Sequence, residues 1–497
     1  MSTLTVKYYI EIPSASPDNN KGDVDRINLQ IQSSTGIGNI DWPLDIIGTV
    51  HHTLHSSGGK LTVTAAPGKG RLKVVTIEPG NTTGVHFGLA VDLGTTVIAA
   101  ELIDLNTGKM IAGAGDINGQ VQYGEDLLTR LHLSSKGGVD KLRQAMLDTI
   151  NKLIGELCSS AEIEPSQISG LCAAGNTSMT HMLLGIDPSP ILHEPYTPII
   201  NHVPEFTAKE LGIDIAPNAV AFIFPNASSF LGGDLISGLI ASGIAERDEI
   251  SLLVDIGTNV EVILGNKEWL LAVAGSAGPA LEGGVAECAI RAKPGAIERV
   301  KIDRNTFEPI YSTISNQKPI GLCGSGLIDT VAELYLSGLL DPTGRFDLGQ
   351  KTDRWKTING KVAYILYEDE APNGTHMTYI TEKDIQNLLR TKAAMVAALT
   401  VLLDSVGLDI DSIARVYTAG SFGIHLSVDS ATAIGLYPRI PAERFVSLGN
   451  GSLAGAGELL KNADRIEDAR LLADKITYLE LNIHPGFMEI FRSAKYL

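Results

Sequence analysis

Two stretches of the chain, GLAVDLGTTVIAAELIDL (Gly88 to Leu105) and SLLVDIGTNVEVILG (Ser251 to Gly265), share one pattern. In each, an apolar strand runs into Asp-x-Gly-Thr and continues into a second apolar strand. This pattern predicts a β-hairpin whose turn can bring backbone N–H groups close to an anion, because Gly has no Cβ and tolerates positive φ. One copy carries little weight, since many turns contain Asp and Gly. Two copies in one chain predict a phosphate-binding hairpin that is used twice.

The polar side chains of the two turns favour a metal-bound polyphosphate. Phosphate would repel the carboxylates of Asp92 and Asp255, unless a divalent cation or its bound waters lie between them. We therefore expect hydrated Mg²⁺ at Asp92 and Asp255. The other turn residues offer backbone or side-chain donors to phosphate: Gly94, Thr95, Thr96, Gly257, Thr258 and Asn259.

A third element follows later in the chain, where IARVYTAGSFG (Ile413 to Gly423) predicts a buried strand that ends in a glycine-rich turn. With the two hairpins before it, the chain resembles the actin, sugar kinase and heat-shock chaperone ATPase superfamily, in the order phosphate 1, phosphate 2 and adenosine motif. The resemblance covers roughly Gly88 to the C-terminus. It implies an α/β fold with duplicated RNase H-like lobes, the actin-like ATPase fold, hinged about a nucleotide cleft.

Length and charge exclude some classes of protein. The chain has 497 residues, which is too long for a single core, and a formal net charge of −18. Because no Lys/Arg block or basic stripe occurs, we expect no nucleic-acid partner. The N-terminus lacks a signal-peptide pattern and no apolar run is long enough to span a membrane, so we expect a cytoplasmic protein without membrane contact.

The chain is expected to form three domains. Residues 1–84 read as a small α+β domain that ends at Pro79-Gly80-Asn81. Residues 85–240 would form the first actin-like lobe. Residues 241–497 would form the second lobe, with a β-rich insertion and a C-terminal segment.

Two further polar residues are placed at predicted helix starts. Asn176 follows a buried strand and begins a helix, where it can contact an anion or ribose. Asp234 begins the helix that precedes the second hairpin. In the chaperone and actin ATPases that the chain resembles, the residue that orients the attacking water lies at this place, so the resemblance implies that role for Asp234. An ordinary acidic residue in a first helical turn remains the alternative.

Local motifs narrow the resemblance to one family. The segments NGQVQYGEDLLTR, AAGNTSMTHMLLG, SSFLGGDLISG, GLCGSGLID and YTAGSFG are similar to those of the reductive activators of corrinoid proteins. This resemblance implies an ATPase that couples ATP binding and hydrolysis to reduction of a cobalt(II) corrinoid protein to the cobalt(I) state. Residues 1–84 resemble that family's middle domain, which implies a homodimer.

The cysteines depart from that family's pattern. Members usually begin with a ferredoxin-like domain that holds a two-iron cluster, whereas this chain has four widely spaced cysteines and no such motif. We therefore expect no iron–sulfur cluster in this chain. An iron–sulfur domain or protein absent from it would supply the electron.

The resemblance assigns roles to individual residues. Asp92 and Asp255 hold hydrated Mg²⁺, Asp234 orients water, and Asn176 contacts the nucleotide. The residues that receive adenosine are Gly420, Ser421, Gly423, Gly449 and Asn450.

Two alternatives of the same fold stay open. A small-molecule kinase would use Asp234 as its base and would need no protein partner. A 2-hydroxyacyl-CoA dehydratase-type activator would hold a four-iron cluster with two cysteines per chain. Ala274 stands where the first of those thiols would be, which leaves only Cys323 as a ligand.

Overall fold

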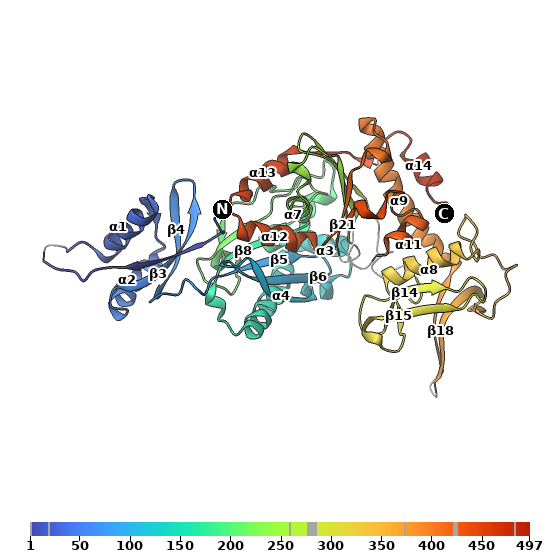
Figure 1. The fold of residues 1–497 in the computed structure, drawn as a ribbon, viewed down its shortest axis with the longest axis horizontal. Helices are drawn as coiled ribbons and strands as arrows, with labels where there is room; N and C mark the ends of the chain where they lie inside the picture. Colours follow the sequence, from blue (N-terminus) through green and yellow to red (C-terminus); the bar gives the residue numbers. More distant parts are fainter. Residues whose placement is uncertain are drawn as a thin grey trace. The chain divides into compact units, whose positions relative to one another are not determined.

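The computed structural model describes residues 2–17, 20–257, 260–275, 286–371, 374–420, 426–481 and 484–497 (Figure 1). The chain divides into two compact units. Unit 1 comprises Met1–Ala241 and Gly451–Lys475, and unit 2 comprises Ser242–Asn450 and Ile476–Leu497. The predicted boundary at residues 84 and 85 lies inside unit 1, and the division into three domains therefore stays a prediction.

Unit 1 begins with a small α+β fold (blue in Figure 1). Its sheet has the strand order β1-β3-β4-β2. Two helices and the sheet bury one apolar cluster, which includes Ile27, Ile31, Val50 and Leu54. The elements are β1 (Val6–Glu11), α1 (Asp23–Thr35), β2 (Asn39–Asp41), α2 (Leu44–Ser56), β3 (Lys60–Gly68) and β4 (Arg71–Pro79).

The larger sheet of unit 1 has the order β7-β6-β5-β8-β10-β9. Strands β5, β6 and β7 form an antiparallel meander. Strand β8 lies parallel beside β5, and β10 lies parallel beside β8. The strands are β5 (Phe87–Leu93), β6 (Val97–Asp104), β7 (Lys109–Ile117), β8 (Ile168–Gly175), β9 (Phe206–Thr207) and β10 (Val220–Ile223). Because β5 and β8 are buried along almost their whole length, they read as continuous apolar runs in the sequence.

Helices pack on this sheet from distant parts of the sequence. Helix α4 contacts β6 and β7, whereas α12, from the C-terminal part of the chain, contacts β5 and β8. The helices of this part are α3 (Leu127–Leu133), α4 (Val139–Ala161), α5 (Thr177–Leu183), α6 (Ala208–Leu211), α7 (Gly233–Ser242), α12 (Gly451–Lys461) and α13 (Arg465–Lys475). The chain thus leaves unit 1 after α7 and returns to it at α12.

The main sheet of unit 2 repeats the scheme, with the order β21-β20-β11-β12-β13-β22. Strands β11, β12 and β13 form the antiparallel meander. Strand β20 lies parallel beside β11, β21 parallel beside β20, and β22 parallel beside β13. The strands are β11 (Ser251–Ile256), β12 (Val260–Gly265), β13 (Leu270–Gly275), β20 (Arg415–Ala419), β21 (Phe445–Gly449) and β22 (Ile476–Tyr478). In both sheets the strand that ends in Asp-x-Gly-Thr therefore lies between its hairpin partner and a parallel neighbour.

Two smaller sheets complete unit 2, with the orders β15-β14-β16 and β17-β18-β19. They correspond to the predicted β-rich insertion. Their strands are β14 (Ala296–Ile302), β15 (Pro309–Thr313), β16 (Gly321–Leu322), β17 (Trp355–Ile358), β18 (Lys361–Ala371) and β19 (Gly374–Thr381). The helices are α8 (Gly324–Leu336), α9 (Glu382–Val406), α11 (Val428–Ala433) and α14 (Phe487–Ser493).

The duplicated α/β architecture predicted from the two hairpins is confirmed by the matching strand orders. Among the described residues, no helix combines the length and the apolar character that a membrane crossing needs.

A close helix contact inside unit 1 gives a test of the fold. A Cβ added to Gly455 of α12 would lie 2.1 Å from the carbonyl oxygen of Ser237 in α7, which forces the backbones apart. We predict that Gly455→Ala lowers the free energy of unfolding by about 1–3 kcal/mol. Thermal and urea denaturation measure this change.

A matched control lies in another helix of unit 1. A Cβ added to Gly155 of α4 would meet no atom within 4 Å. Gly155→Ala should therefore raise stability by about 0.5–1 kcal/mol, because alanine has the smaller entropy cost in a helix interior. Equal effects of the two substitutions would contradict the α7–α12 contact.

Candidate nucleotide site

The first hairpin carries Asp92 at the end of a buried strand. Asp92 lies in the last part of β5, where it is half-buried beside Ala99 of β6 and Ala174 of β8. A Cβ at Gly94 would lie 2.1 Å from the carbonyl oxygen of Val97, so only glycine fits this turn. The turn therefore holds its backbone close together directly after the carboxylate.

Buried side chains from a neighbouring segment fasten this turn. Arg130, which is fully buried, donates from Nη1 to the carbonyl oxygen of Thr95 at 2.5 Å. Asn118 donates from Nδ2 to the carbonyl oxygen of Gly94 at 2.9 Å, and its backbone N–H donates to Thr96 O at the same distance. The backbone carbonyl groups of this turn therefore accept hydrogen bonds from Arg130 and Asn118.

Asn176 connects the parallel strand to the same turn. Its Oδ1 accepts from the N–H of Met179, which caps α5, and its Nδ2 donates to Oγ1 of Thr95 at 2.9 Å. The structure brings Asn176 and the first hairpin together.

Asp234 lies close to Asn176. A Cβ at Gly232 would lie 2.4 Å from Cα of Asn176 and 2.8 Å from Oδ1 of Asp234, so the start of α7 is pressed against the start of α5. Asp234 Oδ1 also accepts from the N–H of Leu235 at 2.8 Å. Burial raises the pKa of Asp234 to about 6, against the lowering effect of hydrogen bonds from the backbone of Leu235 and of Asp234 itself. Asp234 is therefore a carboxyl group poised to exchange a proton near neutral pH.

The second hairpin shows a related arrangement within unit 2. Asp255 of β11 is half-buried and lies beside Glu261 of β12 and Ala419 of β20. Gly420 follows β20 with φ +90°, and a Cβ there would lie 2.4 Å from Ile256 O and 2.9 Å from Oδ1 of Asp255. The end of the adenosine-like strand is thus packed directly against the carboxylate of the hairpin.

The next strand continues this edge. Gly449 ends β21 in register with Ala419, and it has φ +67°. Asn450 follows it directly. Unit 2 therefore gathers Asp255, Gly257, Gly420, Gly449 and Asn450 at the carboxyl ends of adjacent strands or directly after them.

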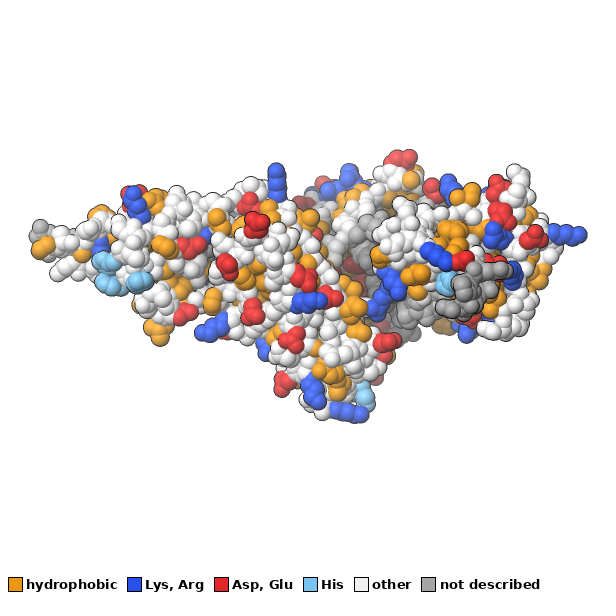
Figure 2. Space-filling view, turned by 90° about the horizontal axis from the view of Figure 1, so that it is seen from below, with side chains coloured by type: hydrophobic (Ala, Val, Ile, Leu, Met, Phe, Trp, Pro, Cys, Tyr) orange, Lys and Arg blue, Asp and Glu red, His pale blue; other side chains and the backbone are white. Residues whose placement is uncertain are grey.

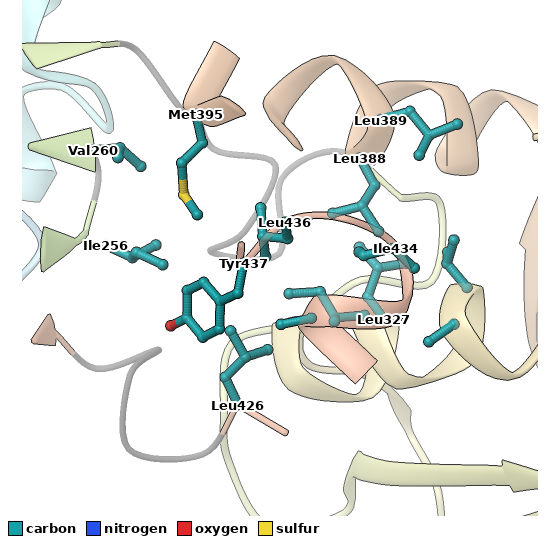
Figure 3. Packing of buried hydrophobic residues seen from close by; sticks show 14 of the residues in the cluster. Ile256, Val260, Leu327, Leu388, Leu389, Met395, Leu426, Ile434, Leu436 and Tyr437 are labelled. Carbon is teal, nitrogen blue, oxygen red and sulfur yellow. The ribbon is translucent and has the colours of Figure 1, made fainter. Parts of the chain in front are cut away.

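A buried apolar cluster of unit 2 includes residues of the second hairpin. Figure 3 shows the ring of Tyr437 between Ile256 and Leu426, and the side chain of Met395 beside Val260. These residues belong to the buried cluster of unit 2. Burial raises the pKa of the Tyr437 hydroxyl, which has no hydrogen-bond partner in the described part of the chain.

Four predicted site residues lie outside the described residues: Thr258, Asn259, Ser421 and Gly423. Cys323, the one thiol retained for a cluster ligand, is buried at the start of α8 and donates to Ile297 O at 3.2 Å. It behaves there as a packed core residue.

Comparison with known proteins decides the family. Residues 249–497 match the C-terminal domain of RACo, described as the ASKHA domain, residues 87–247 match the RACo middle region, and residues 1–84 match the RACo linker region. The chain belongs to the RACo family. This confirms the expected resemblance to reductive activators of corrinoid proteins and to the actin-like ATPase fold.

The names of similar proteins point to the same family. The structure of the "Reductive activator for corrinoid,iron-sulfur protein" has a TM-score of 0.91 and 37% identity, and the match covers 100% of this chain and 79% of that one. The "Corrinoid activation enzyme RamQ" of Eubacterium limosum is 28% identical over 82% of this chain and 69% of the relative. The "[Co(II) methylated amine-specific corrinoid protein] reductase" of Methanosarcina barkeri is 23% identical over 79% and 73%.

One detail of the predicted resemblance was wrong. Residues 1–84 correspond to the RACo linker region rather than to the middle domain, which instead matches residues 87–247. The small α+β fold of residues 1–84 is therefore the counterpart of the RACo linker region.

Sequence reasoning also missed two residues that shape the first hairpin of this RACo protein. Arg130 and Asn118 lie in the segment NGQVQYGEDLLTR, whose sequence indicates only the family resemblance. An arginine that is fully buried gives no signal in an isolated sequence, because arginine is ordinarily exposed. The Asp126 N-cap of α3, four residues earlier, was the available local signal.

The raised pKa of Asp234 gives a pH-dependent test. The carboxyl binds its proton more tightly in the folded protein than in the unfolded chain, so its contribution to stability falls as pH rises from about 4 to about 6. We predict that Asp234→Asn is more stable than wild type at pH 7 by about 1–3 kcal/mol, with no such advantage at pH 4. Thermal denaturation of nucleotide-free protein across this range measures the difference.

Asp126 offers a control of opposite sign. Hydrogen bonds from the Thr129 side chain and backbone lower the pKa of Asp126, so its contribution is present at neutral pH and is lost as pH falls through the acid range. Asp126→Asn should therefore be less stable than wild type at pH 7. An Asp234→Asn variant with the same trend as Asp126→Asn would contradict the raised pKa of Asp234.

Proposed function

We propose that this protein uses ATP binding and hydrolysis to drive the one-electron reduction of a cobalt(II) corrinoid protein to the cobalt(I) state. The main support is the 37% identity, over the whole chain, with a solved reductive activator of a corrinoid iron–sulfur protein. The two curated relatives, whose names also refer to corrinoid proteins, support the same substrate class.

Magnesium-bound ATP is the proposed nucleotide. Asp92 and Asp255 fit a hydrated cation, because each is a half-buried carboxylate at a strand end, beside backbone that is too close for a Cβ. Mg²⁺ held there would offset the charge of the phosphates. The proposed phosphate contacts are Gly94, Thr95, Thr96, Asn176, Gly257, Thr258 and Asn259, and the proposed adenosine contacts are Gly420, Ser421, Gly423, Gly449 and Asn450.

Asp234 is proposed to orient the attacking water. With its pKa at about 6, the carboxyl is mostly ionised at pH 7 and can accept a hydrogen bond or a proton from water. Its closeness to Asn176, which is bonded to the first hairpin, supports a place beside the phosphates.

The reduction requires ATP for an energetic reason. The reduction potential of cobalt(II)/cobalt(I) corrinoid couples lies below the potentials of ordinary cellular electron donors, so electron transfer to cobalt(II) is thermodynamically unfavourable without a further source of free energy. Conformational coupling typically supplies about 1–3 kcal/mol. For one electron this corresponds to a shift of about 40–130 mV in reduction potential, which changes the equilibrium ratio of cobalt(I) to cobalt(II) by about 5–150-fold.

The remaining parts of the proposal concern partners. The electron is proposed to come from an iron–sulfur domain or protein, and the protein is proposed to act as a homodimer in the cytoplasm. Of the four cysteines, Cys158, Cys172 and Cys323 are buried and Cys288 is partly buried.

A paired assay tests the function. Phosphate release is measured under anaerobic conditions with and without a cobalt(II) corrinoid protein, while absorption follows the corrinoid in the presence of a low-potential donor. We predict that the corrinoid protein stimulates phosphate release and that the cobalt(I) spectrum develops only when ATP is supplied.

Two variants sharpen this assay. Asp255→Ala should abolish phosphate release with the fold retained, whereas Asp234→Asn should lower kcat by about 10²–10⁴-fold while ATP still binds. Phosphate transfer to a small molecule without any corrinoid protein would instead identify a kinase. ATP hydrolysis that ignores the corrinoid protein would also overturn the proposal.

A further inference from the structure

A group of metal-ligating side chains lies far from the nucleotide residues in the sequence, on the N-terminal α+β fold. Asp23 comes from α1, and His51 and His55 come from α2. One ligand atom from each lies within 4.8 Å of the other two. In the space-filling view, histidine side chains gather on the surface of this part of unit 1 (Figure 2).

The distances suit one metal ion. Oδ2 of Asp23 lies 2.8 Å from Nδ1 of His51 and 3.6 Å from Nε2 of His55. In a tetrahedral site with metal–ligand bonds of about 2.0–2.2 Å, neighbouring ligand atoms are about 3.3–3.6 Å apart. The distance to His55 lies at the upper end of this range, and the distance to His51 is shorter than the range. The side chain of His51 is 81% exposed, so it can move by the few tenths of an ångström that the fit needs.

The helix geometry fixes the two histidines on one face. Residues at i and i+4 lie above each other on a helix, which is the spacing that presents two imidazoles to one Zn²⁺ in helical metal sites. Val50 and Leu54, one residue before each histidine, are buried in the domain core. The core therefore sets the rotation of α2 and with it the positions of His51 and His55.

A buried arginine orients the carboxylate. Arg26 donates from Nη1 to Oδ1 of Asp23 at 3.2 Å, which leaves Oδ2 for the histidines. The carboxylate of Asp23 is thus held in place by a neighbouring side chain, as the ligands of metal sites commonly are.

We propose that Asp23, His51 and His55 bind one divalent transition metal ion of the Zn²⁺ class and so bridge α1 and α2. Two imidazoles and one carboxylate suit Zn²⁺, Co²⁺ or Ni²⁺, whereas Mg²⁺ prefers oxygen ligands in an octahedral arrangement. Three protein ligands leave a coordination position for water or another ligand. A metal that binds the folded domain and not the unfolded chain stabilises it by mass action.

This site is independent of the proposed nucleotide function. Its ligands come from the linker-region residues 1–84, and none of them takes part in the hairpins. Loss of metal binding would leave the corrinoid proposal intact, and loss of ATPase activity would leave the metal site intact.

The test uses the full chain, treated with a chelator and free of nucleotide. Zn²⁺ binding is measured by calorimetry, and Co²⁺ is added in a parallel titration to read the visible absorption of its coordination geometry. We expect one Zn²⁺ per chain, a Co²⁺ spectrum without thiolate charge-transfer bands, and a rise in the thermal midpoint of unfolding with Zn²⁺.

Matched variants on α2 separate a built site from general surface binding. His55→Ala and Asp23→Asn should each weaken Zn²⁺ binding at least tenfold. His52→Ala should leave it unchanged, because His52 is exposed on the same helix but lies outside the cluster. His55→Asn serves as a second variant if His55→Ala unfolds.

Three results would overturn the proposal. They are the absence of stoichiometric Zn²⁺ binding to the wild type, unchanged binding in His55→Ala and Asp23→Asn, and equal weakening in His52→Ala. Each would mean that Asp23, His51 and His55 form only a surface ion pair.

Discussion

Each half of this protein depends on a carboxylate that stands at the end of a buried central strand, where the backbone is too close for a side chain. In unit 1, Asp92 ends β5 just before Gly94, whose missing Cβ leaves room for the carbonyl of Val97. In unit 2, Asp255 ends β11, and Gly420 approaches its carboxylate from the parallel strand. A larger residue at either glycine would push the strand ends apart, and the polar groups that border Asp92 and Asp255 would move with them.

The candidate site depends, secondly, on the parallel strand that lies beside each hairpin strand. In both sheets the hairpin strand pairs with its antiparallel partner on one side and with a parallel strand on the other. Parallel pairing places the carboxyl ends of β5 and β8, or of β11 and β20, at one edge of their sheet, and this is why Asn176 reaches Thr95 and Gly420 reaches Asp255. The loop that begins α7 then brings Asp234 against Asn176, which explains how one edge can hold a carboxylate, an amide and a second carboxyl with a raised pKa.

The hairpins could be predicted from the sequence because β5 and β11 are apolar runs that end abruptly in Asp-x-Gly-Thr. Strand β7 was missed, since its sequence KMIAGAGDI has small residues and glycines in place of a clear alternation of polar and apolar residues. Arg130 could not be assigned to the hairpin, because its role depends on a fold that buries a charged side chain against backbone carbonyls. Asp234 could be assigned as a candidate from its position, but its raised pKa comes from tertiary burial and from no local pattern. The Asp23, His51 and His55 cluster was likewise invisible, since Asp23 and the histidines lie on different helices.

We propose that the binding of Mg–ATP depends on the carboxylates of both Asp92 and Asp255, and a double-mutant cycle tests this proposal most directly. Calorimetry would measure Mg–ATP binding to the wild type, Asp92→Asn, Asp255→Asn and the double variant. The account predicts one nucleotide per chain, weaker binding of Mg–ATP in each single variant, and a double variant whose loss of binding free energy differs from the sum of the single losses. Two independent nucleotides per chain would contradict it. So would a single substitution that leaves Mg–ATP binding unchanged, with a double variant that loses only as much binding free energy as the other single variant.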